Sequence, residues 1–449
     1  MKFLMISNAG EGCHILKMIQ KEGNDVQLYI KDPQYRELWD GLLPKVKKVA
    51  PSKDTVVIFD FSSMGALADE LKAAGHFVVG GSKFADKLEQ DRKFGLELME
   101  KVGIKVPLTA EFSKFDEIDD FIKENGNSEE GGPPRRFVFK PSGKDLPTHL
   151  TYVSIDNEDL LEYVAYVKEN YSGKVKSFVL QEFVDGVVVS TEMWSDGEKF
   201  IRPANHTVEV KGFMNRCLGP ATGCSGNLVW VEEGICRIAA NGIARVEKDV
   251  VESGYIGPID LNAVVNDAGI WGLEFTPRFG YDATPTQMFL FKDEIGKFFS
   301  DIARGQLQDE MPLSDKFAAA VRFSIPPYPL DPPKVSDIQE VRPNVGIPIR
   351  GLTEKNAGSL YFYEVIEKDG QLQHSPGIGL IGAAVGVADH PCRAVDDAYG
   401  VLQSLEVPEI QYRTDLGAVL ESMYEQVDYQ DGASTSLGVI PEVELEDAG

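Results

Sequence analysis

The first hundred residues alternate short apolar segments with amphipathic ones. Apolar runs at 2–7, 55–61 and 77–81 are typical of strands, and each is followed by residues with apolar positions at helical spacing. This alternation predicts a parallel, doubly wound sheet, because each helix returns the chain to begin the next strand. The loop after the first strand holds Gly10 and Gly12 but lacks the G-x-G-x-x-G of dinucleotide sites, which disfavours an oxidoreductase.

After a linker at 103–107 the pattern changes. A helix is predicted at 115–125, and strands separated by turns fill most of 135–202. A second helix is predicted over 232–254, with Gly254 closing it. From about Ala318 the chain is mixed α/β.

Two further strands, at 256–267 and 269–277, are joined by the turn sequence "NDAG" and predict an antiparallel hairpin. Asp260 lies on the first strand and Glu274 on the second, 14 residues later, so the two carboxylates are expected to face each other. Carboxylates that close repel unless a divalent cation such as magnesium lies between them. Arg278 then suits a phosphate or an oxyanion. The alternative is an internal ion pair between Glu274 and Arg278.

Three other segments carry candidate chemistry. Lys140 ends a strand before the turn "PSGK" and is suited to nucleotide phosphates, although a solvated lysine is the commoner case. The extended segment 179–186 offers backbone groups for an adenine edge, or is a core strand. The glycine-rich stretch 219–227 is predicted to be a loop whose amides approach an anion, or a plain surface loop.

Composition limits the partners. Of 449 residues, 71 are acidic and 45 basic, and the formal charge of -26 disfavours nucleic acid and anionic membranes. The chain starts on a strand and has no apolar run of membrane-spanning length, so a soluble, cytoplasmic protein is expected. Five scattered cysteines without a C-x-x-C motif argue against a disulfide framework or a zinc site.

Taken in order, these motifs resemble the ATP-grasp fold, and within it the phosphoribosylamine–glycine ligases. Lys140 after a strand, "QEFVDG" at 181–186 and "LEFTPRFGYDATPTQ" at 273–287 carry the resemblance. It extends through "AVRFSIPPYP" at 320–329 to "YRTDLG" at 412–417. The resemblance implies an α/β fold: an ATP-grasp domain with an N-terminal doubly wound, Rossmann-like domain and a C-terminal α/β domain.

The resemblance also implies domain limits. They are 1–105 for the N-terminal domain, 106–325 for the ATP-grasp domain and 326–430 for the C-terminal domain. A small nucleotide-clamping lobe is expected at about 120–190. Residues 431–449 are expected to form an acidic, disordered tail.

The implied reaction joins a carboxylate, such as that of glycine, to an amine. ATP phosphorylates the carboxylate, the amine attacks the acyl phosphate, and an amide forms, which requires positioning and charge neutralisation rather than a protein nucleophile. By position, the resemblance assigns phosphate contacts to Arg92 and Lys140, and adenine contacts to Gln181, Glu182, Phe183 and Val184. It assigns magnesium (or manganese) binding to Asp260, Glu274 and Thr276, and catalysis to Lys140 and Arg278. The carboxylate substrate is assigned to Lys211, Gly219, Pro220, Thr222, Gly223 and Arg278.

Several positions depart from the family pattern. Thr276 stands where the family has Asn, "GVV" at 186–188 lacks an acidic residue for the ribose, and the loop after Lys140 is poorer in glycine. "AGEGCHI" at 9–15 and "FDF" at 59–61 replace the motifs that hold phosphoribosylamine. The alternatives are therefore a ligase with a different amine acceptor and a catalytically impaired nucleotide-binding module. Either acts on small molecules, as a monomer or homodimer.

Overall fold

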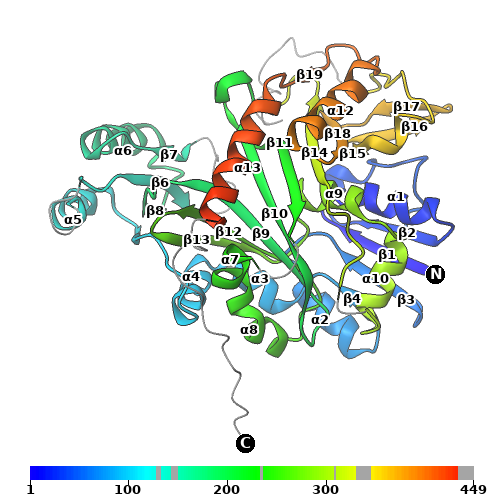
Figure 1. Ribbon diagram of the computed structural model, residues 1–449, viewed down its shortest axis with the longest axis horizontal. Coiled ribbons are helices and arrows are strands. Elements are labelled where there is room, and N and C mark those ends of the chain that lie inside the picture. Colours follow the sequence, from blue (N-terminus) through cyan, green and yellow to red (C-terminus); the bar gives the residue numbers. More distant parts are fainter. Residues whose placement is uncertain (128–132, 143–149, 233–235, 308–309, 330–344, 433–449) are drawn as a thin grey trace, which may run out of the picture.

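The computed structural model describes residues 1–127, 133–142, 150–232, 236–307, 310–329 and 345–432 (Figure 1). Parts of the predicted loops after residue 127 and after Lys140, and residues 433–449 of the predicted tail, lie outside this range. Residues 431 and 432 end helix α13, Leu416–Gly432. None of the helices in the described ranges is long and apolar enough to cross a membrane.

The N-terminal part is a four-stranded sheet in the order β2–β1–β3–β4 in which every pairing is parallel. This confirms the predicted doubly wound sheet. The predicted helical stretch 85–103 is two helices, because Asp91 accepts a hydrogen bond from the amide of Phe94 and caps the start of a new one. The elements are β1 Lys2–Ser7, α1 Cys13–Lys21, β2 Asp25–Ile30, β3 Thr55–Phe59, α2 Gly65–Ala73, β4 Phe77–Val79, α3 Lys83–Gln90 and α4 Arg92–Lys101.

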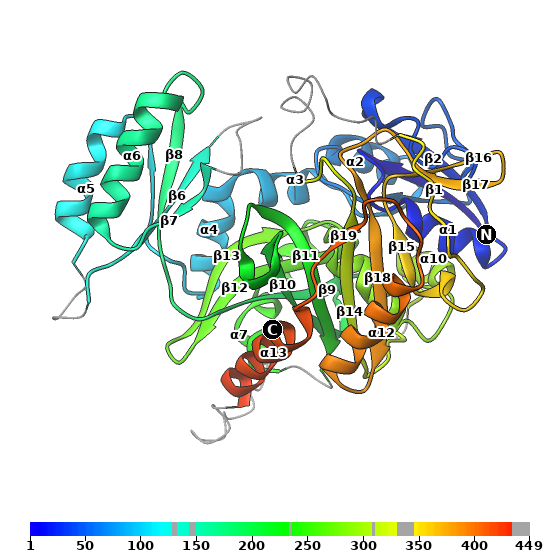
Figure 2. The same ribbon diagram turned by 90° about the horizontal axis from the view of Figure 1, so that it is seen from above.

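A small lobe projects from the rest of the molecule (Figures 1 and 2). Its antiparallel sheet, in the order β5–β8–β6–β7, is packed on two helices through a separate apolar core that includes Phe137, Phe139 and Phe178. The lobe begins at Thr109, earlier than expected, because β5 pairs with β8. The elements are β5 Thr109–Phe112, α5 Ile118–Asn125, β6 Phe137–Ser142, β7 Tyr152–Val153, α6 Asn157–Tyr171 and β8 Ser177–Glu182.

A large sheet fills the centre, in the order β13–β12–β9–β10–β11–β14–β18–β15, with β19 paired to β14. Because β14 pairs with β18, the sheet continues across residue 325, where a domain boundary was expected. The domain limits stay a prediction. The strands are β9 Val187–Ser195, β10 Phe200–Gly212, β11 Ala221–Val231, β12 Gly257–Asn266, β13 Gly269–Thr276, β14 Phe317–Ser324, β15 Leu360–Phe362, β18 Leu380–Ala388 and β19 Gln411–Tyr412, with a separate hairpin of β16 Val365–Lys368 and β17 Gln371–His374.

Two predicted elements are wrong. The glycine-rich stretch 219–227 is not a loop beyond residue 220, because residues 221–227 belong to β11, in which Ala221, Gly226 and Asn227 pair with β10 across an irregularity. Gly226 suits this strand, since a Cβ there would lie 2.4 Å from the Leu416 side chain. The helix expected over 232–254 breaks at Gly242, where a Cβ would lie 2.7 Å from the carbonyl oxygen of Ile238. It is replaced by α7 Arg237–Asn241, a 3-10 turn and α8 Glu247–Glu252.

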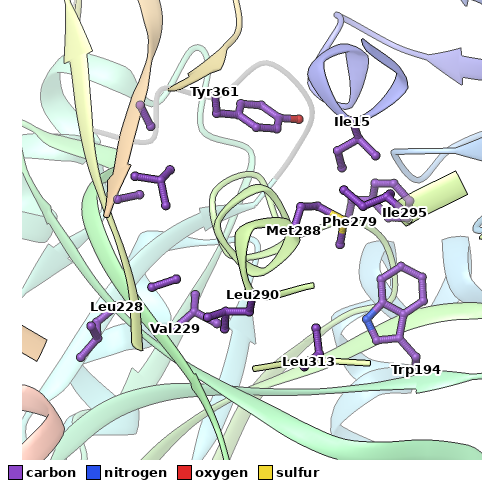
Figure 3. Packing of buried hydrophobic residues seen from close by; sticks show 14 of the residues in the cluster. Ile15, Trp194, Leu228, Val229, Phe279, Met288, Leu290, Ile295, Leu313 and Tyr361 are labelled. Atoms are coloured by element: carbon purple, nitrogen blue, oxygen red, sulfur yellow. The ribbon is translucent and has the colours of Figure 1, made fainter. Parts of the chain in front are cut away.

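Apolar packing joins the N-terminal sheet to the central sheet. Figure 3 shows Ile15 of α1 near Phe279, Met288 and Ile295, the last of these on α10 (Ile295–Ala303). The helices α12, Pro391–Gln403, and α13 and the short α9, Ala283–Gln287, also pack on the central sheet. The packing places the ends of β1 and β3 beside the segment that follows β13.

Candidate active site

A one-residue bulge sets the faces of the β12–β13 hairpin. Asn266 pairs with Gly269 and Ala263 with Gly272, but Asn262 pairs with Glu274, so Leu273 is the extra residue. Without the bulge, Glu274 would oppose Leu261 and point away from Asp260. The bulge therefore brings the predicted metal residues to one face of the sheet.

The predicted pairing of Asp260 with Glu274 is corrected by the register. Asp260 lies opposite Thr276, and Glu274 lies opposite Asn262, so the two carboxylates are diagonal neighbours. The amide Nδ2 of Asn262 donates to Asp260 Oδ1 at 3.2 Å and lies 3.5 Å from Thr276 Oγ1. The side chain of Glu274 is exposed. These four side chains supply oxygen donors, the type that magnesium prefers.

Further carboxylates line the same face of the sheet. Glu192 on β9 pairs in register with Asp260, and burial raises the pKa of Glu192 to about 7. The pKa of Asp260 is raised well above its usual range, chiefly by burial and then by the charges of Glu192 and Glu209. Burial also raises the pKa of Glu209 to about 7. A cation at Asp260 would relieve this repulsion, so the donor set fits magnesium.

Lys140 and Gln181 face the same region from the small lobe. Lys140 Nζ donates to Gln181 Oε1 at 2.6 Å. The pKa of Lys140 is lowered to about 8, first by burial and then by the charge of Arg92, whereas Glu274 raises it and Lys211 lowers it. Arg92 of α4, Glu274 of β13 and Lys211 of β10 therefore all lie within electrostatic reach of Lys140.

The predicted adenine segment leads from the small lobe to the central sheet. The amide of Glu182 donates to the carbonyl of Leu108, and the amide of Phe183 to that of Arg136, both at 2.8 Å. The carboxylate of Glu182 accepts from Arg135 Nε at 3.2 Å. The amides of Glu182 and Phe183 are thus engaged within the protein, and Val184 is the next residue along the segment.

Arg278 is held by a carboxylate that the sequence did not indicate. Its Nε donates to Glu89 Oε1 of α3 at 3.0 Å, and its guanidinium lies 4.2 Å from the ring centre of Tyr281. The alternative expected from the sequence was an ion pair between Arg278 and Glu274. Arg278 does form an ion pair, but its partner is Glu89. Burial, the largest single influence, opposes the charge on Arg278, but Glu89, Tyr281 and Asp260 together raise its pKa.

Apart from Arg278, the residues predicted for the carboxylate substrate lie where β10 turns into β11. Thr222 donates to the carbonyl of Lys211 at 2.9 Å, and Gly219 and Pro220 lie in the exposed turn between the two strands. Arg413, buried in the "YRTDLG" motif, donates to the carbonyl of Gly212 at 2.9 Å and supports this turn.

A cavity of about 1170 Å³ lies between α4 and the small lobe. Its walls include Arg92, Thr109, Val179, Glu182 and Trp271. Lys140 and the four oxygen donors of the hairpin do not line it. The cavity therefore borders Arg92 and part of the predicted adenine segment 179–186, but not the metal-binding face of the hairpin.

Sequence reasoning missed Asn262, Ser190, Glu192 and Glu89. Ser190 donates to Asn262 Oδ1 at 2.7 Å, and Trp194 Nε1 donates to Glu192 Oε1 at 3.0 Å. Ser190 and Glu192 are separated by one residue on a predicted strand, so their side chains lie on the same face. This spacing could have indicated that both belong to the site. Glu89 carried no such signal.

The chain is similar in sequence to several phosphoribosylamine–glycine ligases. That of Corynebacterium ammoniagenes is 26% identical over 447 residues, covering 94% of this chain and 98% of the relative. That of Methanosarcina barkeri is 24% identical over 446 residues, covering 93% and 96%. No protein-family model matches the chain.

Solved structures agree in fold. The phosphoribosylamine–glycine ligase of Thermotoga maritima has a TM-score of 0.65 at 20% identity, covering 92% of this chain and 99% of that structure. The biotin carboxylase domain of a Hydrogenobacter thermophilus 2-oxoglutarate carboxylase, solved with MgADP and bicarbonate, has a TM-score of 0.61 at 13% identity, covering 96% and 95%. The chain has the ATP-grasp fold, and along nearly its whole length it resembles the phosphoribosylamine–glycine ligases.

Proposed function

We propose that this protein is an ATP- and magnesium-dependent ligase that joins a carboxylate to an amine and releases ADP, in the manner of a phosphoribosylamine–glycine ligase. The observation that carries the proposal is the set of oxygen donors on one face of the β12–β13 hairpin, with Lys140 of the small lobe close enough for Glu274 and Arg92 to act on its charge. The full-length resemblance to ligases of that name supports it.

The chemistry requires cations around the phosphates of ATP. Lys140 and Arg92 supply positive charge on one side, and Arg278 supplies it beyond the end of β13. ATP phosphorylates the substrate carboxylate, which leaves ADP and an acyl phosphate. The amine nitrogen then bonds to the acyl carbon, the bond from that carbon to the phosphate oxygen breaks, and phosphate leaves.

Asp260, Asn262, Glu274 and Thr276 would hold magnesium. The ion, when bound, would supply positive charge that offsets the charge of the ATP phosphates. The same oxygen donors accept manganese. Glu274 suits this role because its side chain is exposed and free to meet a nucleotide, while Asp260 is anchored by Asn262.

The segment 179–186 offers fewer free backbone amides to adenine than the sequence implied. Since the amides of Glu182 and Phe183 donate within the protein, we assign the adenine-facing amide to Val184. Gln181 would act by holding Lys140. Lys211, Gly219, Pro220, Thr222 and Gly223 would border the carboxylate substrate, in a cytoplasmic monomer or homodimer with the domain limits predicted above.

The test is a coupled ADP-release assay with ATP, magnesium, glycine and freshly prepared phosphoribosylamine. The proposal predicts ADP release that depends on magnesium and on a carboxylate. A parallel reaction with hydroxylamine traps the acyl phosphate as a hydroxamate and reports carboxylate activation without an acceptor. Failure to form a hydroxamate with any amino acid would contradict the proposal.

Two observations favour a second candidate, a nucleotide-binding protein without ligase activity. Arg278 is already neutralised by Glu89, and Thr276 is a weaker metal ligand than an amide. This candidate predicts that ATP binds without ADP release or hydroxamate formation, so the same two assays separate it from the ligase.

A further inference from the structure

A histidine, a glutamate and a cysteine meet on the face of the central sheet opposite the candidate active site. His206 lies on β10, Glu232 directly follows β11, and Cys236 directly precedes α7. Their ligand atoms all lie within 4.8 Å of one another. His206 pairs with Thr191 on β9, and the next residue of β9 is Glu192, which points to the active-site face. We refer to the three residues as the His–Glu–Cys cluster.

His206 is held with one ring nitrogen toward the cluster. Its side chain is fully buried. Nδ1 lies 3.0 Å from Thr191 Oγ1, and Nε2 lies 3.2 Å from Cys236 Sγ. Burial lowers the pKa of His206 to about 4, so the imidazole is neutral at pH 7. A neutral imidazole whose second nitrogen has a hydrogen-bond partner is the form in which histidine binds a metal ion.

Cys236 and Glu232 supply a sulfur and a carboxylate from the partly exposed side of the cluster. Cys236 Sγ accepts from the amide of Ala239 at 3.3 Å, which fixes the sulfur at the start of α7. Burial, followed by the charge of Glu232, raises the pKa of the Cys236 thiol. A thiol in such a setting stays protonated until a metal ion displaces the proton.

Helix α13 covers this face of the sheet and adds a second carboxylate. Tyr424 of α13 packs edge-on against Trp230, with ring centres 5.1 Å apart. At the end of the same helix, Asp431 Oδ1 accepts from the amide of Ile238 at 2.9 Å, so Asp431 lies against α7. Burial, followed by the charge of Asp431, raises the pKa of Glu232. A divalent cation would offset the repulsion between these two carboxylates.

The donor types favour zinc over magnesium. Imidazole nitrogen, thiolate sulfur and carboxylate oxygen are all zinc ligands, whereas magnesium takes oxygen ligands. A second group of candidate ligands, on the active-site face, consists of Glu209, Cys224 and Asp282. It offers no imidazole, and Asp282 is already paired with Arg322. The His–Glu–Cys cluster is therefore the better zinc site of the two.

We propose that His206, Glu232 and Cys236 bind a zinc ion, with water in the fourth tetrahedral position. On binding, the Cys236 thiol releases its proton to solvent, a zinc–sulfur bond forms, and no atom changes oxidation state. The proposal departs from the expectation drawn from the absence of C-x-x-C, because the pairing of β10 with β11 brings His206 near ligands about 30 positions away. It does not depend on the proposed ligase activity.

The experiment titrates the full chain with Co²⁺, a spectroscopic substitute for zinc, after chelator treatment and in a reducing buffer with excess magnesium. We expect one equivalent of Co²⁺ to produce a thiolate charge-transfer band that zinc removes. Cys236→Ser should abolish the band, and Glu232→Gln should weaken cobalt binding about tenfold or more. Cys392→Ser is the matched control, because Cys392 also contacts a carboxylate, that of Glu421 at 2.9 Å, and it should keep the band.

Urea unfolding with zinc or with chelator gives a second measurement. Zinc should raise the unfolding midpoint of wild type and of Cys392→Ser, because it binds the folded chain, but not that of Cys236→Ser. Glu232→Gln keeps the size of a partly exposed side chain, so its cobalt affinity decides the test if Cys236→Ser does not fold.

Three results would overturn the inference. Cobalt bound without a thiolate band would place the ion on oxygen donors, such as those of the β12–β13 hairpin. A band that persists in Cys236→Ser, or that disappears in Cys392→Ser, would place it on another cysteine. Wild-type cobalt affinity in Glu232→Gln would remove the carboxylate from the site.

Discussion

Arg278 Nε donates to Glu89 Oε1 at 3.0 Å, and this contact joins the end of the β12–β13 hairpin to α3 of the N-terminal part. The side chains are 14% and 22% exposed, and Glu89 Oε2 has no hydrogen-bond partner among the described residues. The pair therefore holds Arg278 in a defined position and prevents a buried, uncompensated charge.

Because Arg278 is paired with Glu89, its structural role and its proposed catalytic role can be tested separately. Arg278→Ala should lower ADP release roughly a hundredfold or more, since one charge-stabilising donor is lost. It should also cost about 2 kcal/mol of unfolding free energy, because the Glu89 carboxylate is left unpaired. Glu89→Ala added to Arg278→Ala should recover most of that stability but none of the activity. Urea unfolding and ADP release of the three proteins test this, and recovered activity in the double variant would remove Arg278 from the site.

Glu274→Gln should abolish magnesium-dependent ADP release with little change in stability. Glu274 is exposed, so an isosteric change should alter the unfolding free energy by less than about 0.5 kcal/mol. Its charge, however, is the part that a divalent cation needs. Glu198→Gln, an exposed glutamate in the turn between β9 and β10, serves as the control. Activity is measured across a magnesium titration, and a variant that turns over normally would reassign the metal site.

Much of the fold follows from local sequence patterns. Alternating strands and helices predicted the parallel sheet, and "NDAG" predicted the hairpin, because both signals act over a few residues. The bulge at Leu273 could not be predicted in this way. It accompanies the packing of Gly272, where a Cβ would lie 2.5 Å from Met99 Sδ of α4, and that contact depends on a distant part of the chain.

The candidate active site, like the fold, could be predicted only as far as local sequence patterns reach. Residue types indicated Asp260 and Glu274, but the pairing of Glu274 with Asn262 depends on the bulge. Glu89 is 189 positions from Arg278, so no spacing rule could connect them. The stretch 221–227 was predicted to be a loop because glycine adopts many backbone conformations. It is part of a strand because β10 lies beside it and pairs with it in the sheet.

His14 should make the fold acid-sensitive. It is buried, and its Nδ1 accepts the amide of Phe362 at 3.0 Å. Burial, then the charges of Lys21 and Lys17, lower the pKa of His14 to about 3 from 6.5. Between these values the unfolded chain binds a proton that the folded chain does not, so stability falls as pH falls, by about 1.4 kcal/mol per pH unit.

His14→Asn keeps an acceptor for Phe362 but does not titrate. Between pH 7 and pH 5, wild type should lose about 2 kcal/mol more unfolding free energy than this variant. Urea unfolding at the two pH values measures the difference, which does not depend on the overall stability of the variant. Equal losses in the two proteins would show that His14 does not contribute to the pH dependence.

Lys140 should set an upper pH limit for nucleotide use. Its pKa is lowered to about 8, mainly by burial, so the ammonium form dominates at pH 7 and is lost as the pH rises above 8. Since the proposed phosphate contact requires the charge, kcat/KM for ATP should be constant below this value and fall about tenfold per pH unit above it.

Lys140→Arg stays charged, so its profile should remain flat through pH 9 even if its plateau is lower. Lys140→Met should lose at least tenfold at pH 7, whereas Lys93→Met, an exposed lysine on α4, should not. A Lys140→Arg profile that falls with the wild-type slope would assign the titration to another group and leave Lys140 with its structural contact to Gln181 alone.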